Sequence, residues 1–238
     1  MSEVDDAIRS RRSVRAFRSD AVSWLVVREL LDVARHAPSG SNIQPWRVHA
    51  LTGEPLKALA DEVSALVAAG SPGCVPEYRY YSDPLPELYL ARRRANGWGL
   101  YGLLGIKRGD RTAGDRQAAR NFRLFDAPVG LFFFIDAHLA QGSWLDYGMF
   151  VQSVMVAARG RGLHTCPQAA WLPYHAVVRR HCRMAEDQQL VCGMAVGHED
   201  TGALVNTFRA PREEVEVFAT SAGFDLPPGG GKRDPTRP

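Results

Sequence analysis

The sequence predicts an α+β fold in which helices cover both faces of a central sheet. Two continuous apolar runs, residues 129–136 (VGLFFFID) and 189–197 (QLVCGMAVG), have the length of strands. A strand that is apolar at nearly every position is covered on both faces, so these runs belong at the centre of a sheet. Segments with helical periodicity occur before, between and after them. We therefore expect three layers, with the sheet between two layers of helices.

Caps, proline breakers and periodicity place the other elements. The helix from Ser23 to His36 is the clearest, because its apolar residues recur at intervals of three and four and Pro38 follows it. Residues 47–51 alternate like a strand, and residues 70–86 form a loop long enough to be a lid. We expect the further helices at Ser2–Ser10, Pro55–Ala69, Glu87–Leu104, Asp110–Phe125, Ser143–Gly160 and Tyr174–Arg183.

The helix at 143–160 is apolar nearly all round, so it must be buried all round. It could be the central core helix of one large monomer. It could equally pack on its own sheet with one face and on a second subunit with the other. Periodicity does not choose between the two.

Bulk composition limits the possible classes of protein. The chain has 238 residues, 45% of them hydrophobic, which suits one domain over residues 1–226. Residues 227–238 have the composition of a disordered tail. A net charge of +3 with dispersed basic residues gives no nucleic-acid footprint. The four cysteines have no metal-site spacing, and no segment is long and apolar enough for a membrane, so we expect a cytoplasmic protein with reduced thiols and no metal.

The stretch RRSVRAF at residues 11–17 has the pattern of a phosphate site. In an extended chain Arg11, Ser13 and Arg15 point to one side, while Arg12 and Val14 point to the other. Arginine supplies forked, charged donors for phosphate oxygens, and serine adds a short neutral donor. The alternative is a solvated basic stretch after a helix.

The stretch APSGSNIQPW at residues 37–46 is more than a turn. Pro38 and the small polar residues after it end a helix, but a turn does not need Gln44, Pro45 and Trp46. The amide of Asn42 offers both a donor and an acceptor, and small residues let a ligand approach the backbone.

Together the two stretches resemble the nitroreductase family of flavin mononucleotide (FMN) enzymes. In that family an RxSxR/KxF segment opens the domain, PSxxNxQPW follows about two dozen residues later, and an arginine near the C-terminus completes the phosphate site. The matching positions here are Arg11 to Phe17, Pro38 to Trp46, and Arg209. Three later stretches, GSWLDYGMF, GLHTCPQAAW and LVCGMAVGHED, are similar to the branch that includes nitrobenzoate reductases.

The resemblance implies a three-layer α-β-α sandwich with a mostly antiparallel sheet, forming an intertwined homodimer with FMN at each interface site. The turn at 38–42 would reach the flavin bound mainly by the other subunit, and Trp46 would be a structural plug. Residues 70–108 would be a variable lid and substrate region. The resemblance assigns the cofactor to Arg11, Arg12, Ser13, Arg15, Pro38, Ser39, Gly40, Asn42, Asn121, Pro167, Gln168, Ala169, Ala170 and Arg209.

Three details of this assignment differ from the family pattern or stay open. Ala169 and Ala170 stand where family members often have Glu-Gly, which costs little if the contact to the ring is a backbone N–H. Thr207 replaces a frequent lysine, so one phosphate cation would be missing. The side chain that contacts the flavin ring is Asn121 or, one residue earlier, Arg120.

The segment from Leu88 to Ile106 is a candidate wall of the substrate pocket. Trp98 and Tyr101 could stack on a planar acceptor, and the arginines at 92–94 could attract a carboxylate. The alternative is a plain surface helix. The histidines show no nucleophile arrangement with Ser or Cys and are expected to be structural or on the surface.

The resemblance implies a ping-pong oxidoreductase in which NADH or NADPH reduces FMN and a nitroaromatic or related acceptor is then reduced in the same pocket. The cofactor carries the chemistry, so no catalytic side chain is expected. The alternatives on the same scaffold are quinone reduction, reductive dehalogenation and oxidative flavin cleavage. A flavin-binding redox sensor without turnover and a cofactor-free basic binding protein are alternatives of other classes. The sequence chooses neither the nicotinamide coenzyme nor the physiological acceptor.

Overall fold

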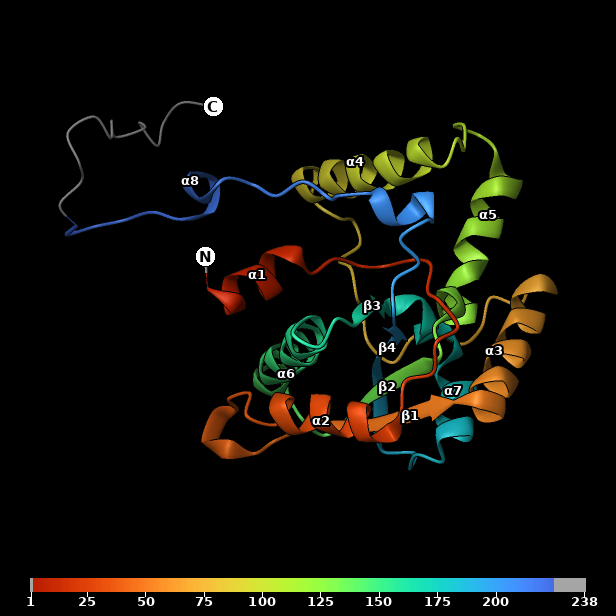
Figure 1. Cartoon of the computed structure of the whole chain (residues 1–238), viewed down its shortest axis with the longest axis horizontal. Coiled ribbons are helices and arrows are strands. Elements are labelled where there is room, and N and C mark those ends of the chain that lie inside the picture. Colours follow the sequence, from red (N-terminus) through yellow and green to blue (C-terminus); the bar gives the residue numbers. More distant parts are fainter. Residues whose placement is uncertain (1, 225–238) are drawn as a thin grey trace.

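A computed structural model describes residues 2–224 of the chain. The tail predicted at 227–238 lies outside the described residues. The strands form one antiparallel sheet in the order β1-β2-β4-β3 (Figure 1). Their bounds are Arg47–Thr52 for β1, Val129–Asp136 for β2, His164–Gln168 for β3 and Gln188–Gly197 for β4.

The two apolar runs form the centre of the sheet because both faces of the sheet are buried. Along β2, Leu131, Phe133 and Ile135 enter one hydrophobic cluster. Phe132 and Phe134 enter another on the opposite face. All five side chains are 0% exposed. Alternate residues of a strand point to opposite faces, so a strand covered on both sides has no polar position.

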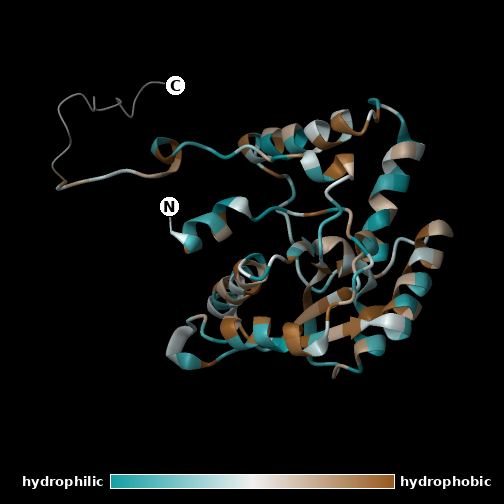
Figure 2. Ribbon diagram, in the orientation of Figure 1, coloured by the Kyte–Doolittle hydropathy of each residue, from teal (hydrophilic) through white to brown (hydrophobic). Residues whose placement is uncertain are grey.

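Helices cover each face of this sheet, as Figures 1 and 2 show. On one face lie α2 (Trp24–Ala34) and α6 (Gln141–Arg159), which pack against each other. On the other lie α3 (Gly53–Ala68), α7 (His175–Cys182) and the 3-10 segments η2 (Arg120–Asp126) and η3 (Ala169–Tyr174). The predicted α+β three-layer fold is confirmed.

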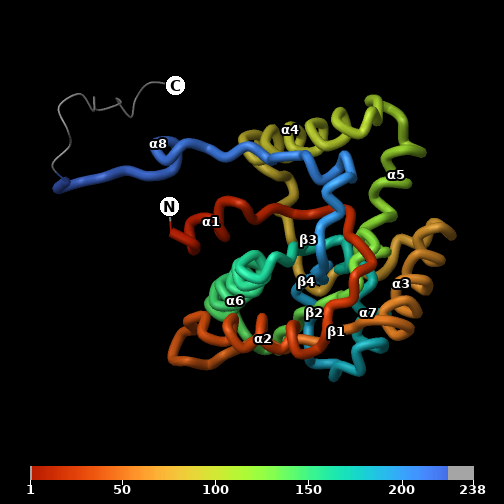
Figure 3. The backbone as a smooth tube through the Cα atoms, viewed as in Figure 1, coloured from red at the N-terminus to blue at the C-terminus, as the bar shows by residue number. Residues whose placement is uncertain are grey.

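The remaining elements lie outside the two helical layers. They are α1 (Glu3–Ser10), η1 (Gly40–Asn42), α4 (Glu87–Leu103), α5 (Arg111–Ala119), η4 (Leu204–Thr207) and α8 (Val215–Phe218). The C-terminal segment runs beside α4 and then projects from the body (Figure 3). Leu100 of α4 packs there with Val205 and Ala16. Gly99 permits this approach, since a Cβ added to it would lie 2.9 Å from Phe208 Cε2.

The single helix expected from Asp110 to Phe125 is wrong in its second half. The α-helix ends at Ala119, and Leu124 and Phe125 have positive φ angles of 47° and 55°. Both side chains are 1% exposed, so burial in the core offsets the unfavourable backbone conformation. Strand β3 and helix α8 were not among the elements that the residue pattern predicted. β3 has only five residues and includes Pro167, which hides a strand pattern.

The loop at 70–86 is fixed to the body over its first half, which argues against a lid that opens as a whole. The Tyr78 hydroxyl donates to Val191 O at 2.7 Å, and the Tyr174 hydroxyl donates to Ser71 O at 3.0 Å. Glu77 pairs with Arg179 and accepts from the Leu190 amide at 3.0 Å.

Helix α6 buries only part of its surface within one chain. Its sheet-facing residues, among them Tyr147 and Phe150, are 1% and 2% exposed. Leu145 on the same helix is 70% exposed. The helix is therefore not buried all round by its own chain. Within residues 2–224, no helix combines the length and the apolar character that crossing a bilayer requires.

Candidate functional site

The phosphate pattern lies on the wall of a cavity of about 260 Å³ between the segment after α1, helix α4 and the C-terminal segment. Six of the side chains that line it are arginines, and no carboxylate is among the described lining residues. The lining consists of Arg9, Arg11, Arg12, Ser13, Arg15, Asn96, Phe208, Arg209, Ala210 and Arg212. Burial, and then the neighbouring Arg212, lower the pKa of Arg11. Cations crowded together without a counter-charge favour a bound anion, and a phosphate fits this cavity.

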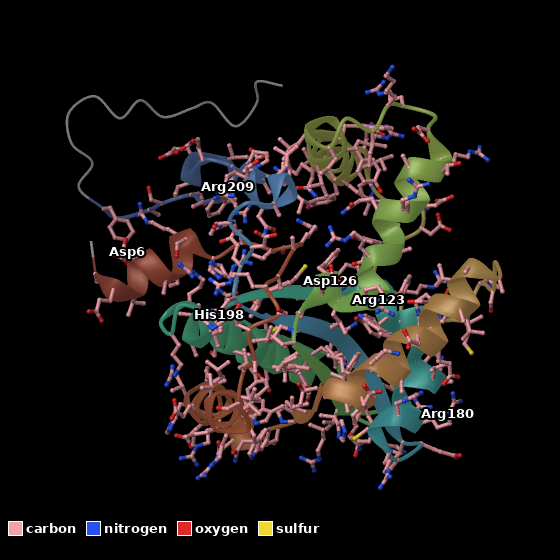
Figure 4. The ribbon with its side chains drawn as sticks, turned by 45° about the vertical axis from the view of Figure 1, so that its right-hand side comes forward. Asp6, Arg123, Asp126, Arg180, His198 and Arg209 are labelled. Atoms are coloured by element: carbon pink, nitrogen blue, oxygen red, sulfur yellow. The ribbon has the colours of Figure 1, made fainter. Side chains whose placement is uncertain are left out.

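The predicted alternation of the segment 11–15 is seen at Val14 but not at Arg12, which lines the cavity together with Arg11, Ser13 and Arg15. Val14 is fully buried, whereas Arg11, Ser13 and Arg15 face the cavity. Arg12 also touches the cavity wall, but its guanidinium is paired with both carboxylate oxygens of Glu199. The structure therefore brings Arg11, Ser13, Arg15 and Arg209 together, while the charge of Arg12 is engaged elsewhere. Figure 4 shows Arg209 on the C-terminal segment.

A second, smaller cavity of about 110 Å³ shares the lining residue Arg15 with the first. Asn121 and Tyr101 also line this second cavity. Between the two candidates for the ring contact, the geometry favours Asn121, since Arg120 forms an ion pair with Asp126 at 3.0 Å. Gln168 Nε2 donates to Asn121 O at 2.8 Å and lies 3.2 Å from Asn121 Oδ1.

Gln168, which donates to Asn121, also lines a third cavity of about 410 Å³ on the α6 side of the sheet. Its walls are mostly aromatic and apolar: Tyr78, Arg79, Tyr80, Trp144, Tyr147, Gly148, Val151, Pro167, Gln168, Ala169, Val191 and Cys192. Gln168 is 3% exposed, and its Oε1 has no hydrogen-bond partner within residues 2–224. The predicted residues Pro167, Gln168 and Ala169 thus meet here, and Ala170 follows directly.

The strand end that presents Gln168 is supported from behind by a close contact between β4 and Trp171. A Cβ on Gly193 would lie 2.6 Å from Trp171 Cδ1, so only glycine permits this approach without a shift. Gly193 pairs with Gln168 in the sheet, and Trp171 is fully buried. The turn from β3 into η3 is therefore a rigid platform.

The turn at 38–42 lies elsewhere in the chain, against the beginning of α6. Gly40 N donates to Asp146 Oδ2 at 3.0 Å, and Asn42 is exposed with a φ angle of 59°. Trp46 stacks on Phe150 with ring centroids 4.7 Å apart, as a structural plug would. Pro38, Ser39, Gly40 and Asn42 line none of the three cavities described above. One chain does not bring them to the phosphate site.

The expected substrate wall is only partly at the site. Tyr101 lies beside Arg15 and Asn121, whereas Trp98 is 40% exposed and stacks with Arg108 at 4.8 Å. The arginines of α4 are engaged: Arg92 pairs with Glu213 at 2.8 Å, Arg93 lies over the Tyr81 ring and Arg94 pairs with Glu87 at 3.3 Å. They are poorly placed to attract a carboxylate.

Several lining residues were missed by the sequence analysis. Arg9 lies two residues before Arg11 and Arg212 three residues after Arg209, so local charge density could have indicated them. The run YRYY at 78–81 is an aromatic signal that also includes Arg79. Asn206 joins Arg15 N to Ala16 O by hydrogen bonds of 2.8 Å each, and no pattern in the sequence marks it. Thr207 donates to Leu204 O and is absent from the lining of the phosphate cavity.

The donor set fits a phosphate-bearing planar cofactor. The cationic cavity shares Arg15 with the small cavity that Asn121 lines. Asn121 in turn accepts a hydrogen bond from Gln168, which lines the larger aromatic cavity. This order matches the phosphate, the polar ring edge and the ring system of FMN. The described residues hold no His, Cys, Asp and Glu grouping that could bind a metal.

Comparisons with known proteins agree with this geometry. The model of the Nitroreductase family matches residues 8–198. The chain is 41% identical over 225 residues to a 4-nitrobenzoate reductase from Pseudomonas putida, covering 94% of this chain and 97% of that protein. It is 41% identical over 217 residues to a chloronitrobenzene nitroreductase from Comamonas testosteroni, covering 91% and 96%.

Solved structures give the same result. An FMN and NADPH-dependent nitroreductase from Sphigopyxis sp. strain HMH superposes with a TM-score of 0.90 at 38% identity, covering 94% of this chain and 100% of that one. The FMN-dependent nitroreductase of Mycobacterium smegmatis, solved in complex with NADPH, gives a TM-score of 0.87 at 29% identity, covering 92% and 98%. Motifs, fold, site and relatives agree that the chain belongs to the nitroreductase family.

Proposed function

We propose that this protein is an FMN-dependent oxidoreductase that passes electrons from NADH or NADPH to nitroaromatic acceptors. The observation that carries the proposal is that three cavities are linked in sequence: the arginine-lined cavity shares Arg15 with the second, and Asn121 of the second accepts a hydrogen bond from Gln168 of the aromatic cavity. Relatives that cover nearly the whole chain are named as nitroreductases, and the cited neighbours are named as FMN- and NADPH-dependent.

Arg11, Ser13, Arg15 and Arg209 would bind the phosphate, and Asn121 with the backbone of residues 167–170 would hold the ring. Bound FMN would supply the hydride and electron chemistry. The buried strand end at Gln168 would fix the ring in one orientation on its platform. The aromatic walls would exclude water while a nicotinamide and an acceptor use the same space in turn, which is a ping-pong scheme.

Arg79 favours acidic acceptors over neutral ones. It lines the aromatic cavity, and no ion pair of Arg79 occurs in the described part of the chain. Burial raises the pKa of Tyr78, and it raises the pKa of Cys192 to about 12, so these neighbours are neutral. Arg79 is thus the one charged side chain among the described lining, and a carboxylate on the acceptor would find its partner there.

The functional unit we propose is a homodimer. The turn at 38–42 is remote from the phosphate cavity of its own chain, so a second copy would bring it to the flavin. Apolar side chains available for an interface include Val4 of α1, Leu145 of α6 and Phe218 of α8, which are 61%, 70% and 72% exposed. Helix α8 projects from the body, as a segment that packs on a partner would (Figure 1).

We further propose one domain over residues 1–226, with 70–108 as the region that varies with substrate. The four cysteines are all free, and reduced thiols suit a cytoplasmic location.

The deciding experiment is an acceptor panel on the purified protein. The preparation should be yellow from bound FMN. NADH and NADPH oxidation is then followed with nitrobenzene, 4-nitrobenzoate and a quinone. Turnover with the nitroarenes supports the proposal, while turnover with the quinone alone indicates the other activity on this scaffold. A yellow protein without steady-state turnover would be a redox sensor, and a colourless protein that binds no FMN would contradict the proposal altogether.

A further inference from the structure

The phosphate segment also makes an ion pair at the edge of the cavity, through Arg12. There Arg12 pairs with both carboxylate oxygens of Glu199, and the two side chains are 22% and 6% exposed. The two residues are 187 positions apart in the chain. Glu199 follows His198, which Figure 4 labels, directly after β4 ends.

Glu199 belongs to a partly buried cluster that continues to α6. Its Oε2 lies 3.2 Å from His164 Nε2, and Arg159 Nη1 lies 2.9 Å from the same nitrogen. Arg159 Nε donates to Ser10 Oγ at 3.2 Å, at the end of α1. Burial, and then Arg159, lower the pKa of His164 to about 4, so the imidazole is neutral at neutral pH. The cluster therefore holds two guanidinium groups and one carboxylate.

Backbone hydrogen bonds attach the phosphate segment to the same two strand ends. Val14 N donates to Thr165 O at 3.1 Å, and Arg18 N donates to His198 O at 2.9 Å. Asp200 N donates to Ala16 O at 3.0 Å. Close to Arg11 and Arg12, the backbone contacts are the bond from Arg11 N to Ala7 O at 3.2 Å and the parallel bridge between Ser13 and Thr165 of β3. The pair between Arg12 and Glu199 adds a side-chain tie between this part of the segment and the end of β4.

We propose that Glu199, acting through Arg12, is a positioning residue that holds Arg11 and Ser13 in place for the flavin phosphate. The inference rests on the proposed FMN function. Arg12 and Arg11 are adjacent in the chain, so holding the Arg12 side chain on Glu199 limits the directions that the Arg11 side chain can take in the cavity. Residues that orient a ligand in this way commonly change affinity by about 10- to 100-fold when they are lost, as is known for metal sites.

A purely electrostatic role for Glu199 predicts the opposite result. A carboxylate near a phosphate site repels the phosphate, so neutralising it should strengthen FMN binding. Positioning predicts that the same neutralisation weakens FMN binding. A general loss of stability would weaken FMN and riboflavin alike, because riboflavin has the same ring and lacks only the phosphate.

The test compares Glu199→Gln with Glu77→Gln on the full-length protein freed of flavin. Glu77 is a matched control, since it also pairs with an arginine, Arg179, and lies 3.6 Å from a histidine, His175. Its side chain is 16% exposed, and it lies outside the lining of the phosphate cavity. The measured quantity is the ratio of the riboflavin Kd to the FMN Kd, obtained from flavin fluorescence titrations.

We expect Glu199→Gln to lower this ratio by about tenfold or more while the riboflavin Kd stays near that of the wild type. Glu77→Gln should leave the ratio unchanged. An unchanged or raised ratio in Glu199→Gln would overturn the proposal. If that variant does not fold, Glu199→Asp replaces it, because this variant keeps the negative charge and shortens the side chain that holds Arg12: a lowered ratio supports positioning, and a wild-type ratio overturns it. A wild-type protein that does not prefer FMN over riboflavin would contradict the proposed function instead.

Discussion

Replacing Arg11 by Gln should weaken FMN binding and stabilise the flavin-free protein in the same variant. Arg11 faces a cavity lined by six arginines, and no carboxylate is among the described lining residues. A charge-assisted hydrogen bond contributes about 1.5 to 3 kcal/mol. Since about 1.4 kcal/mol corresponds to a tenfold change, the FMN Kd should rise by roughly 10- to 150-fold.

The flavin-free protein should respond in the opposite direction. Burial, and then Arg212, lower the pKa of Arg11, so its charge is unfavourable until an anion binds. Relief of one like-charge interaction is worth about 0.2 to 0.5 kcal/mol. In a domain of this size that raises Tm by roughly 0.4 to 2 °C.

The assay combines FMN titration of the flavin-free protein with differential scanning calorimetry. The matched control is Arg92→Gln, because Arg92 pairs with Glu213 on the surface and does not line the phosphate cavity. That variant should keep the FMN affinity of the wild type. An Arg11→Gln protein that binds FMN as tightly as this control, or that melts below the wild type without FMN, would refute the reasoning.

Three further predictions concern the acceptor, the platform and the assembly. Arg79→Gln should lower the ratio of kcat/KM for 4-nitrobenzoate over nitrobenzene by about two- to fivefold, because an exposed ion pair is worth up to about 1 kcal/mol. Arg93→Gln is the control. Equal kcat/KM ratios in the two variants would exclude a role for Arg79. Gly193→Ala should lower Tm, because its Cβ would lie 2.6 Å from Trp171 Cδ1 and overpacking costs about 1 to 3 kcal/mol. Gly97→Ala should raise Tm, because nothing lies within 4 Å of the added Cβ and alanine is favoured in a helix by about 0.5 to 1 kcal/mol. Tm shifts of the same sign in the Gly193→Ala and Gly97→Ala variants would be inconsistent with this reasoning. FMN should raise the dimer's Tm in a manner that depends on protein concentration, and sedimentation showing an FMN-loaded monomer would contradict the shared site.

The central layers of the fold could be predicted because their signals are local. The alternating burial of Leu131, Phe132, Phe133 and Phe134 requires an apolar residue at every position, and that run is visible in the sequence. The alternation of Arg11, Ser13 and Arg15 follows from strand geometry alone. In both cases the residues of one short segment determine which side chains are buried and which face a cavity.

Features that join distant segments could not be predicted in this way. The pair between Arg12 and Glu199 depends on β4 ending beside the phosphate segment, which no local pattern reveals. The break after Ala119 depends on core space for Leu124 and Phe125, which overrides helical periodicity. The arginines of α4 were predicted to attract a carboxylate of the substrate. Arg92 and Arg94 instead pair with Glu213 and Glu87 of the same chain, and the pairing of Arg92 with Glu213 joins segments that are far apart in the sequence.

The arginines of the phosphate segment differ in whether a carboxylate neutralises them. Arg11 and Arg15 face a cavity without a described carboxylate, so their charge is available to an anion. Arg12, between them in the chain, faces Glu199 and is neutralised inside the protein. Without Glu199, the Arg12 guanidinium would add an unpaired charge to the repulsion in the flavin-free state. If Glu199 itself lined the cavity, its carboxylate would repel the phosphate. Glu199 lies outside the lining, so it can neutralise Arg12 without replacing the phosphate as the partner of Arg11 and Arg15.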